Sequence, residues 1–313
     1  MKESARTQAF PATGNRDGHS LRGMVLMALA MLMIPAIDVF AKLLGQTMSP
    51  GQVVWFRFFV QSLLITPIIL YLGEWRVSPG TVKVQIARGV LIAAATLFFF
   101  AALNYLSIAA AIAIFFIEPM ILTILSVIFL GETIRMRRIF AILAGFVGAL
   151  IVIRPSFAAV GLPALLPLAT AVCFAFYVML TRTLTERVNP FQMQWMVGLS
   201  ALTVMSLALV LGEFSGIDVF RASLPEGIEI AWVFSLGLIA TVGHLMLVLA
   251  VRDAPTSLLA PFQYLEIIGA TVFGYLVFDN IPDLETILGV AVIVASGLYL
   301  FHRESVNARK GQD

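Results

Sequence analysis

Charged residues are scarce in this sequence. Only 12% of its 313 residues are Asp, Glu, Lys or Arg, whereas 60% are hydrophobic and the mean hydropathy is +0.97. Residues 155–181 and 188–212 contain no charged residue at all. A soluble domain of this size has too little interior to bury so much apolar surface. The composition therefore excludes a soluble protein and predicts one that is embedded in a lipid bilayer.

Cysteine and histidine are also rare. The single cysteine, Cys173, excludes a disulfide framework. With three histidines, no glycine-rich phosphate loop and no His-Glu-x-x-His motif, the sequence offers little for metal or nucleotide chemistry. We therefore expect no cofactor, no bound metal, no nucleic-acid partner and no enzymatic activity. An integral-membrane enzyme acting on a lipid-linked substrate is the alternative from another class.

The apolar runs have the length of membrane-spanning helices. A helix needs about 20 apolar residues to cross a hydrocarbon layer of roughly 30 Å, and lipid offers no hydrogen-bond partner to an open backbone. We predict an all-α integral membrane protein with ten transmembrane helices. The expected spans are residues 22–45, 50–72, 86–105, 108–130, 138–153, 163–184, 190–211, 229–251, 255–277 and 283–301.

Basic residues indicate the orientation in the membrane. If the N-terminus is cytoplasmic, most Lys and Arg residues fall in cytoplasmic segments, for example Arg76, Lys83 and Arg88, whereas the outer links are acidic. We predict a multi-pass protein of the bacterial inner membrane with both termini in the cytoplasm.

The second half of the sequence repeats the pattern of the first. An offset of 148 residues places Glu118 on Glu266, and an offset of 140 residues places Trp55 on Trp195. Each half holds five spans, an odd number, so the halves insert in opposite orientations and form inverted repeats that suit alternating access. The predicted divisions are a polar cytoplasmic tail (1–20), a first five-helix repeat (21–154), a second five-helix repeat (155–302) and a cytoplasmic tail (303–313).

Several short motifs point to a known family. They are Pro50 followed by Arg57, Glu118-Pro119, Gly131-Glu132, and Gly145 to Gly148. With ten spans in two halves, the chain resembles the EamA-type branch of the drug/metabolite transporter superfamily from about Arg22 to His302. Asp279-Asn280 departs from the Gly-Glu that the second repeat of this family often shows. The resemblance implies a secondary transporter of a small organic solute that is amino-acid-, vitamin- or nucleotide-like, with import and export both open.

Glu118 and Glu266 are the main candidates for the solute site. Counted along their spans, both reach roughly 15 Å into the membrane, close to its midplane. Desolvation there favours the neutral carboxyl, which suits proton coupling or pairing with a cationic group on the solute. The alternative is a protonated structural glutamate. Pro119 weakens the helix beside Glu118 because it has no N–H to donate.

A second charged set lies in the first two spans. Asp38 and Lys42 are one helical turn apart, and Arg57 reaches a depth similar to that of Asp38. The three residues are interpreted as an outer gate or an anion contact for the solute, or as a static ion pair that ties the two spans together.

Polar and aromatic residues at similar levels complete the expected chamber. Gln263, Tyr264, Asn104 and Trp55 are the predicted solute-binding or proton-coupling residues. Phenylalanines at 98–100, 115 and 116 form a patch on which a flat solute such as riboflavin stacks, or they simply pack together.

The remaining features concern packing and partners. His244 is either a proton relay or an imidazole bonded to a helix carbonyl. The small residues Ala141, Gly145, Gly148, Gly289 and Gly297 are expected at close helix contacts. The expected partners are the small-molecule solute and the lipid bilayer, and a homodimer stays open.

Overall fold

The computed structural model describes residues 16–130, 136–184, 188–254, 259 and 262–310. Within these residues the regular structure is helical. The helices are α1 (Arg16–Met33), α2 (Pro35–Leu44), α3 (Pro50–Leu72), η2 (Pro79–Thr81), α4 (Val82–Leu103), α5 (Ile108–Phe115), α6 (Glu118–Leu130), α7 (Met136–Val160), η3 (Leu162–Leu165), α8 (Leu166–Arg182), α9 (Pro190–Ser215), η4 (Asp218–Phe220), α10 (Glu229–Asp253), α12 (Leu265–Phe278) and α13 (Leu284–Lys310).

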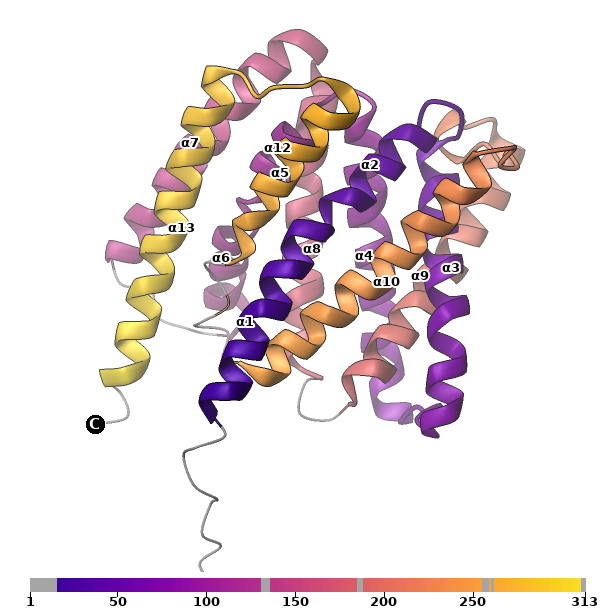
Figure 1. Cartoon of the computed structure of the whole chain (residues 1–313), viewed down its shortest axis with the longest axis horizontal. Coiled ribbons are helices and arrows are strands. Elements are labelled where there is room, and N and C mark those ends of the chain that lie inside the picture. Colours follow the sequence, from indigo (N-terminus) through magenta and orange to yellow (C-terminus); the bar gives the residue numbers. More distant parts are fainter. Residues whose placement is uncertain (1–15, 131–135, 185–187, 255–258, 260–261, 311–313) are drawn as a thin grey trace, which may run out of the picture.

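Eight helical segments of the described residues are long and apolar enough to cross a membrane. The apolar helix 265–278 and the apolar part of α13, residues 284–299, are shorter. The chain is therefore an all-α, multi-pass membrane protein, as predicted. Helix α1 begins and α13 ends at the same end of the bundle (Figure 1), which we call the terminal end.

The expected first span, residues 22–45, consists of two helices. The last bond of α1 runs from the amide of Ile34 to the carbonyl of Ala30 at 2.8 Å, and α2 begins at Pro35. Proline cannot donate to the preceding turn, so the helical ladder is interrupted there and restarts with proline in its first turn.

The expected fourth span, residues 108–130, is also broken. Helix α5 ends at Phe115 and α6 begins at Glu118, so Glu118 opens a helix instead of lying eleven residues inside one. The missing N–H of Pro119 weakens the helix at this point, because it leaves the carbonyl of Phe115 without its helical donor. The expected ninth span was to begin at Pro255, which lies outside the described residues, and α12 begins at Leu265.

Other helices continue past their expected bounds. Helix α7 runs through the expected boundary between the halves at 154/155 and ends at Val160, with Pro155 inside it. Helix α1 begins within the expected tail 1–20, and α13 extends into the expected tail 303–313. Hydropathy marks only the membrane-embedded part of a helix, whereas Ala, Arg and Lys prolong helices into water.

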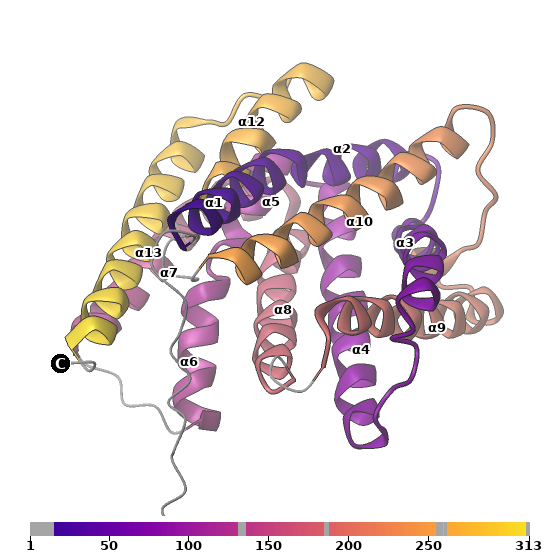
Figure 2. The same cartoon turned by 60° about the horizontal axis from the view of Figure 1, so that its bottom comes forward.

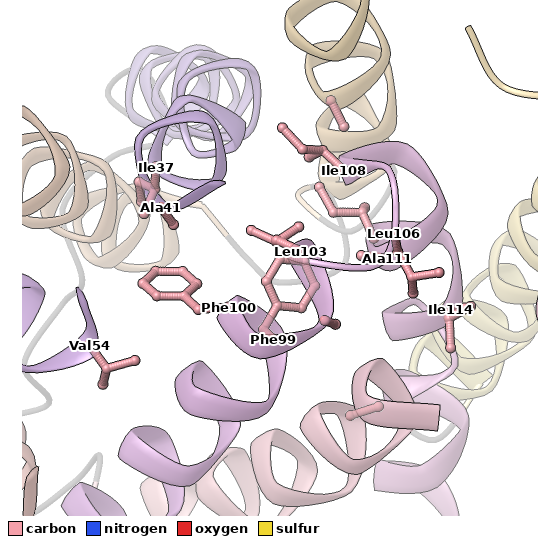
Figure 3. Packing of buried hydrophobic residues seen from close by; sticks show 14 of the residues in the cluster. Ile37, Ala41, Val54, Phe99, Phe100, Leu103, Leu106, Ile108, Ala111 and Ile114 are labelled. Carbon is pink, nitrogen blue, oxygen red and sulfur yellow. The ribbon is translucent and has the colours of Figure 1, made fainter. Parts of the chain in front are cut away.

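The helices pack in a small set of neighbouring pairs. Helix α1 lies against α10, α4 against α8, α3 against α9, and α7 against α13; the α7–α13 pair lies at one side of the bundle in both Figure 1 and Figure 2. A central apolar cluster joins α2, α3, α4 and α5. Figure 3 shows Phe100 of α4 beside Ala41 of α2, with Val54 of α3 on its other side.

Candidate functional site

The break between α5 and α6 lies against a second break just before α12, where residues 262 and 263 are helical and Tyr264 forms a turn. Phe116 caps the end of α5, Tyr264 precedes the first residue of α12, and their ring centroids are 5.5 Å apart. Glu118 and Glu266 follow in the first turns of α6 and α12, and both are half-buried. The free N–H groups of a helix start favour negative charge, so each glutamate faces a favourable local field.

A third acid lies at a third helix start. Asp38 is buried in the first turn of α2 and interacts electrostatically with Glu266 and with Arg57. Three carboxyl groups thus occupy the first turns of helices that follow breaks or short connections. Discontinuous helices of this kind form solute and ion sites in many transporters.

Arg57 is the cationic member of this group. Its side chain is buried, its Nη1 donates to Thr96 Oγ1 at 2.8 Å, and its guanidinium lies 4.6 Å from the ring centroid of Phe58. Its Nε has no hydrogen-bond partner in the described part of the chain. Within those residues no basic group lies within 4.0 Å of the Asp38 carboxylate, so Asp38 and Arg57 interact only at longer range.

Lys42 has different partners from those that its spacing suggested. Its Nζ donates to the carbonyl of Leu103 at 2.8 Å and also to that of Leu106, and it lies 5.5 Å from the ring centroid of Phe278. The static pair with Asp38 is therefore not formed. Instead, Lys42 joins the end of α2 to the end of α4 and to α12, because the last carbonyls of a helix lack donors of their own.

Of the other expected site residues, only some lie at the meeting point of the two breaks. Tyr264 lies at the meeting point of the breaks, as described above. Trp55 donates from Nε1 to Ser206 Oγ at 2.8 Å and stacks on Phe59, so it packs between α3 and α9. Asn104 and Gln263 are exposed, and Asn104 follows the last residue of α4, where its side chain lies against Gly45.

The phenylalanine patch packs on itself. Phe115 contacts Phe99 and Phe174, with centroids 6.1 and 5.4 Å away, and Phe174 contacts Tyr177 at 5.5 Å. Together with the Phe116–Tyr264 contact, these rings form a continuous series. We call it the aromatic row: Tyr264, Phe116, Phe115, Phe174 and Tyr177.

Two simpler expectations are met. The Nδ1 of His244 donates to the carbonyl of Ala240 at 2.8 Å, which is the helix-carbonyl alternative. A Cβ on Gly148 would come within 2.9 Å of the carbonyl oxygen of Gly289, so these glycines form the close contact between α7 and α13. Gly131-Glu132 and Arg135 lie outside the described residues, as do the side chains of Arg137, Arg138, Ala141 and Arg182.

Arg88 is the residue that sequence reasoning missed. It was grouped with the cytoplasmic basic residues, yet it is 1% exposed and lies between α4 and α8. Its Nε donates to Thr181 Oγ1 at 2.9 Å and its Nη1 to Gln85 Oε1 at 2.6 Å. Its Nη2 reaches Tyr177 Oη at 3.5 Å. The available signal was Gln85 one turn before Arg88, a polar pair on one face of an apolar helix.

Comparison with known proteins supports transport. Residues 21–154 and 161–301 each match the EamA-like transporter family. An S-adenosylmethionine uptake transporter of Rickettsia felis is 25% identical over 284 residues, which are 91% of this chain and 94% of that protein. A riboflavin transporter of Brucella anthropi is 26% identical over 287 residues (90% and 99%), and a pseudopaline exporter of Pseudomonas aeruginosa is 25% identical over 281 residues (89% and 95%).

A solved crystal structure also shares the fold. It is 18% identical, covers 90% of this chain and 96% of that chain, and has a TM-score of 0.63. The named relatives all move small molecules, and both import and export occur among them.

Proposed function

The chain belongs to the EamA-like transporter family, and on that premise we propose that it is a secondary carrier of a small organic metabolite in the bacterial inner membrane. The family and its transporter relatives make it a membrane transporter of small molecules rather than an enzyme. The proposal adds alternating access between two inverted five-helix halves, a solute that is amino-acid-, vitamin- or nucleotide-like, and coupling to protons or to exchange.

One observation carries the proposal. The ring of Phe116 contacts the ring of Tyr264 where the two broken segments meet, and an acid follows two residues later in each segment. Helix α6 runs from this point towards the terminal end, and α12 runs towards the opposite end (Figure 1). Two ionisable groups at the meeting point of two broken helices favour a solute or proton site.

Pairs of equivalent contacts support the inverted halves. Trp55 donates to Ser206, and Trp195 donates from Nε1 to Thr66 Oγ1 at 3.0 Å. The offset of 140 residues that relates Trp55 to Trp195 also relates Thr66 to Ser206. The second hydrogen bond is therefore the first with the roles of the halves exchanged, which is the relationship that a two-fold axis produces.

Glycine contacts repeat the same relationship elsewhere. A Cβ on Gly89 would overlap Ser200, and a Cβ on Gly237 would overlap Val60. The offsets of 148 and 140 residues connect these two contacts as well. Equivalent packing of α4 on α9 and of α10 on α3 favours two halves that exchange conformations in turn.

The acids suggest how transport is coupled. A carboxyl group within the hydrocarbon layer is stable when it is protonated or when it pairs with a cation, and the exchange of one state for the other links solute binding to proton movement. Asp38, which interacts with Glu266, extends this group to a third site. We place both termini in the cytoplasm, since α1 begins and α13 ends at one end of the bundle and the basic residues favour that side.

The test begins by finding the solute. Metabolite pools are compared inside and outside cells with the gene deleted or overexpressed, and uptake of the changed solute is then measured in proteoliposomes with an imposed pH gradient. We expect Glu118→Gln or Glu266→Gln to abolish transport while the protein still inserts in the membrane. The matched control is Glu285→Gln, because Glu285 also lies in a first helical turn but is exposed. Normal, pH-insensitive transport by both site variants rejects the assigned role.

Riboflavin uptake is a second, more specific candidate. It is favoured by the aromatic row, whose ring faces suit a flat heterocycle, and by the relative named as a riboflavin transporter. The measurement is growth of a riboflavin auxotroph on limiting riboflavin with and without the gene. Equal growth of the two strains rejects this candidate and leaves the wider proposal in place.

A further inference from the structure

Two buried arginines make no direct ion pair with any residue that the structure describes. Arg57 is 5% exposed and Arg88 is 1% exposed. Within the described residues, neither guanidinium has a carboxylate oxygen within 4.0 Å. A buried charge is costly unless an opposite charge or a dense set of hydrogen bonds compensates it. Arg57 is balanced only at longer range by Asp38, and Arg88 brings a positive charge into the bundle with neutral hydrogen-bond partners.

Some of the buried hydrogen-bond donors at these two arginines have no acceptor in the described part of the chain. Arginine carries five N–H groups, and Arg88 uses three of them on the neutral partners Thr181, Gln85 and Tyr177. The Nε2 of Gln85, which is 0% exposed, has no hydrogen-bond partner in the described part of the chain, and neither has the Nε of Arg57. Unused donors beside a guanidinium that has no direct ion pair are typical of an anion-binding site.

Arg57 of α3 and Arg88 of α4 lie at different levels along the axis of α4. Arg57 binds Thr96 of α4, and Arg88 lies eight residues earlier on that helix, so the two levels are about 12 Å apart. Tyr177 connects them: its hydroxyl accepts from Arg88 at 3.5 Å, its ring centroid lies 5.1 Å from the Arg88 guanidinium, and its phenol group interacts electrostatically with Arg57. Tyr177 is also the end of the aromatic row that starts at Tyr264.

We propose that Arg88 and Gln85 form an anion-binding station near the terminal end of α4, with Arg57 as the companion station nearer the acids, and that both receive the carboxylate or phosphate group of the solute. This inference rests on the proposed function and narrows its substrate class to solutes with an anionic group. Asp38 interacts electrostatically with both Arg57 and Glu266, so a solute that also carries an amine finds a carboxyl group beside the arginines.

The decisive variant gives Arg88 an internal counter-ion. Gln85→Glu preserves the shape of the side chain and places a carboxylate where Gln85 already accepts from Arg88. Because it neutralises a buried charge, the variant is expected to fold at least as well as the parent. It also competes with any external anion for the same donors. The matched control is Gln46→Glu, which adds the same charge at an exposed position.

Binding is measured on the purified full chain in detergent without added lipid, as the rise of the unfolding temperature with acetate or inorganic phosphate at constant ionic strength. We expect a saturable rise in the parent and in Gln46→Glu, and an affinity lower by at least about ten-fold in Gln85→Glu. Because no lipid is added, a response to acetate or phosphate reports binding of the free anion and not of a lipid headgroup. An equal response in Gln85→Glu, or no response in the parent, overturns the proposal.

A second measurement uses a pair of organic probes that differ in one group. S-adenosylmethionine carries a carboxylate that its decarboxylated form lacks. We expect Gln85→Glu to weaken binding of the first by at least about ten-fold and to change binding of the second by less than about two-fold. Equal losses for both probes indicate a purely structural Arg88 and reject the station. Neither assay involves transport, so their failure is distinguishable from failure of the glutamate variants in proteoliposomes.

Discussion

The ring of Phe116 lies 5.5 Å from the ring of Tyr264, and this contact holds together the two breaks that precede Glu118 and Glu266. It depends on space provided by α13, since a Cβ on Gly297 would overlap the hydroxyl of Tyr264. The positions of both glutamates therefore depend on a glycine in the last helix, which lies outside their own segments.

The first prediction tests that dependence. Gly297→Ala is expected to displace Tyr264 and to lower transport by about ten-fold or more, because a small misplacement of a binding group is costly. Tyr264→Phe removes the overlapping hydroxyl, so the double variant Gly297→Ala with Tyr264→Phe is expected to recover transport to the level of Tyr264→Phe alone. A double variant as impaired as Gly297→Ala contradicts this account.

The second prediction concerns the two ends of the bundle. Lys42 joins α2, α4 and α12 at the end of the bundle opposite the terminal end. At the terminal end, the Nε of Arg22 lies 3.4 Å from the Oδ2 of Asp253. The test introduces a cysteine in the central region and adds a membrane-impermeant thiol reagent from the outside. In Lys42→Met we expect this cysteine to be labelled about ten-fold faster. Lys42→Arg is the control.

Arg22→Gln is expected to act at the other end and more weakly, because Arg22 is largely exposed and surface ion pairs contribute little. Labelling is then compared from the two sides of oriented vesicles. If both variants open the same side, Lys42 and Arg22 do not close opposite ends.

The third prediction uses the equivalent glycine contacts. Gly89→Ala and Gly237→Ala are each expected to lower the unfolding temperature in detergent, by similar amounts, because each added methyl group meets a neighbouring helix at Ser200 or Val60. Overpacking of this kind costs about 1–3 kcal/mol. Gly80→Ala is the control, since a Cβ there meets nothing within 4 Å. An effect confined to one of the two glycines argues against equivalent halves.

The fourth prediction concerns the tryptophan hydrogen bonds. Trp55→Phe with Ser206→Ala, and Trp195→Phe with Thr66→Val, form two double-mutant cycles. Each coupling energy is expected near 0.6 kcal/mol and below about 1.7 kcal/mol, the range found for hydrogen bonds between membrane helices. Chemical denaturation in mixed micelles gives the measurement, and a coupling of zero in both cycles leaves the two bonds without a role in stability.

The membrane class and the long helices follow from composition, whereas the helix breaks do not. Residues 108–130 are almost continuously apolar, so hydropathy merges α5 and α6 into one span. Pro35 begins the helix after the α1–α2 break, and Pro119 lies in the first turn after the α5–α6 break. Proline also occurs within intact helices here, at Pro67 and Pro155. Whether a proline ends a helix is decided by tertiary contacts that the local sequence does not contain.

The charged residues show the same limit. Spacing along the helix suggested Asp38 as the partner of Lys42, but the carbonyls of Leu103 and Leu106 accept its hydrogen bonds. Arg88 was grouped with the residues that set orientation, and its burial arises from Tyr177 and Thr181, about 90 residues later. Local rules rank nearby partners, whereas buried charges are satisfied by whichever groups the whole fold brings close.

The α7–α13 pair has a practical consequence. These two helices pack chiefly on each other, through Gly148 and Gly289, at one side of the bundle. The neighbouring pairs that include α1, α3, α4, α8, α9 and α10 can slide without remaking that contact. A fluorophore attached at an exposed position of α7, such as Leu143 or Val147, therefore supplies a stationary reference. With a second dye on α1 or α10, the distance between the two dyes in single molecules reports the motion of the helix that carries the second dye.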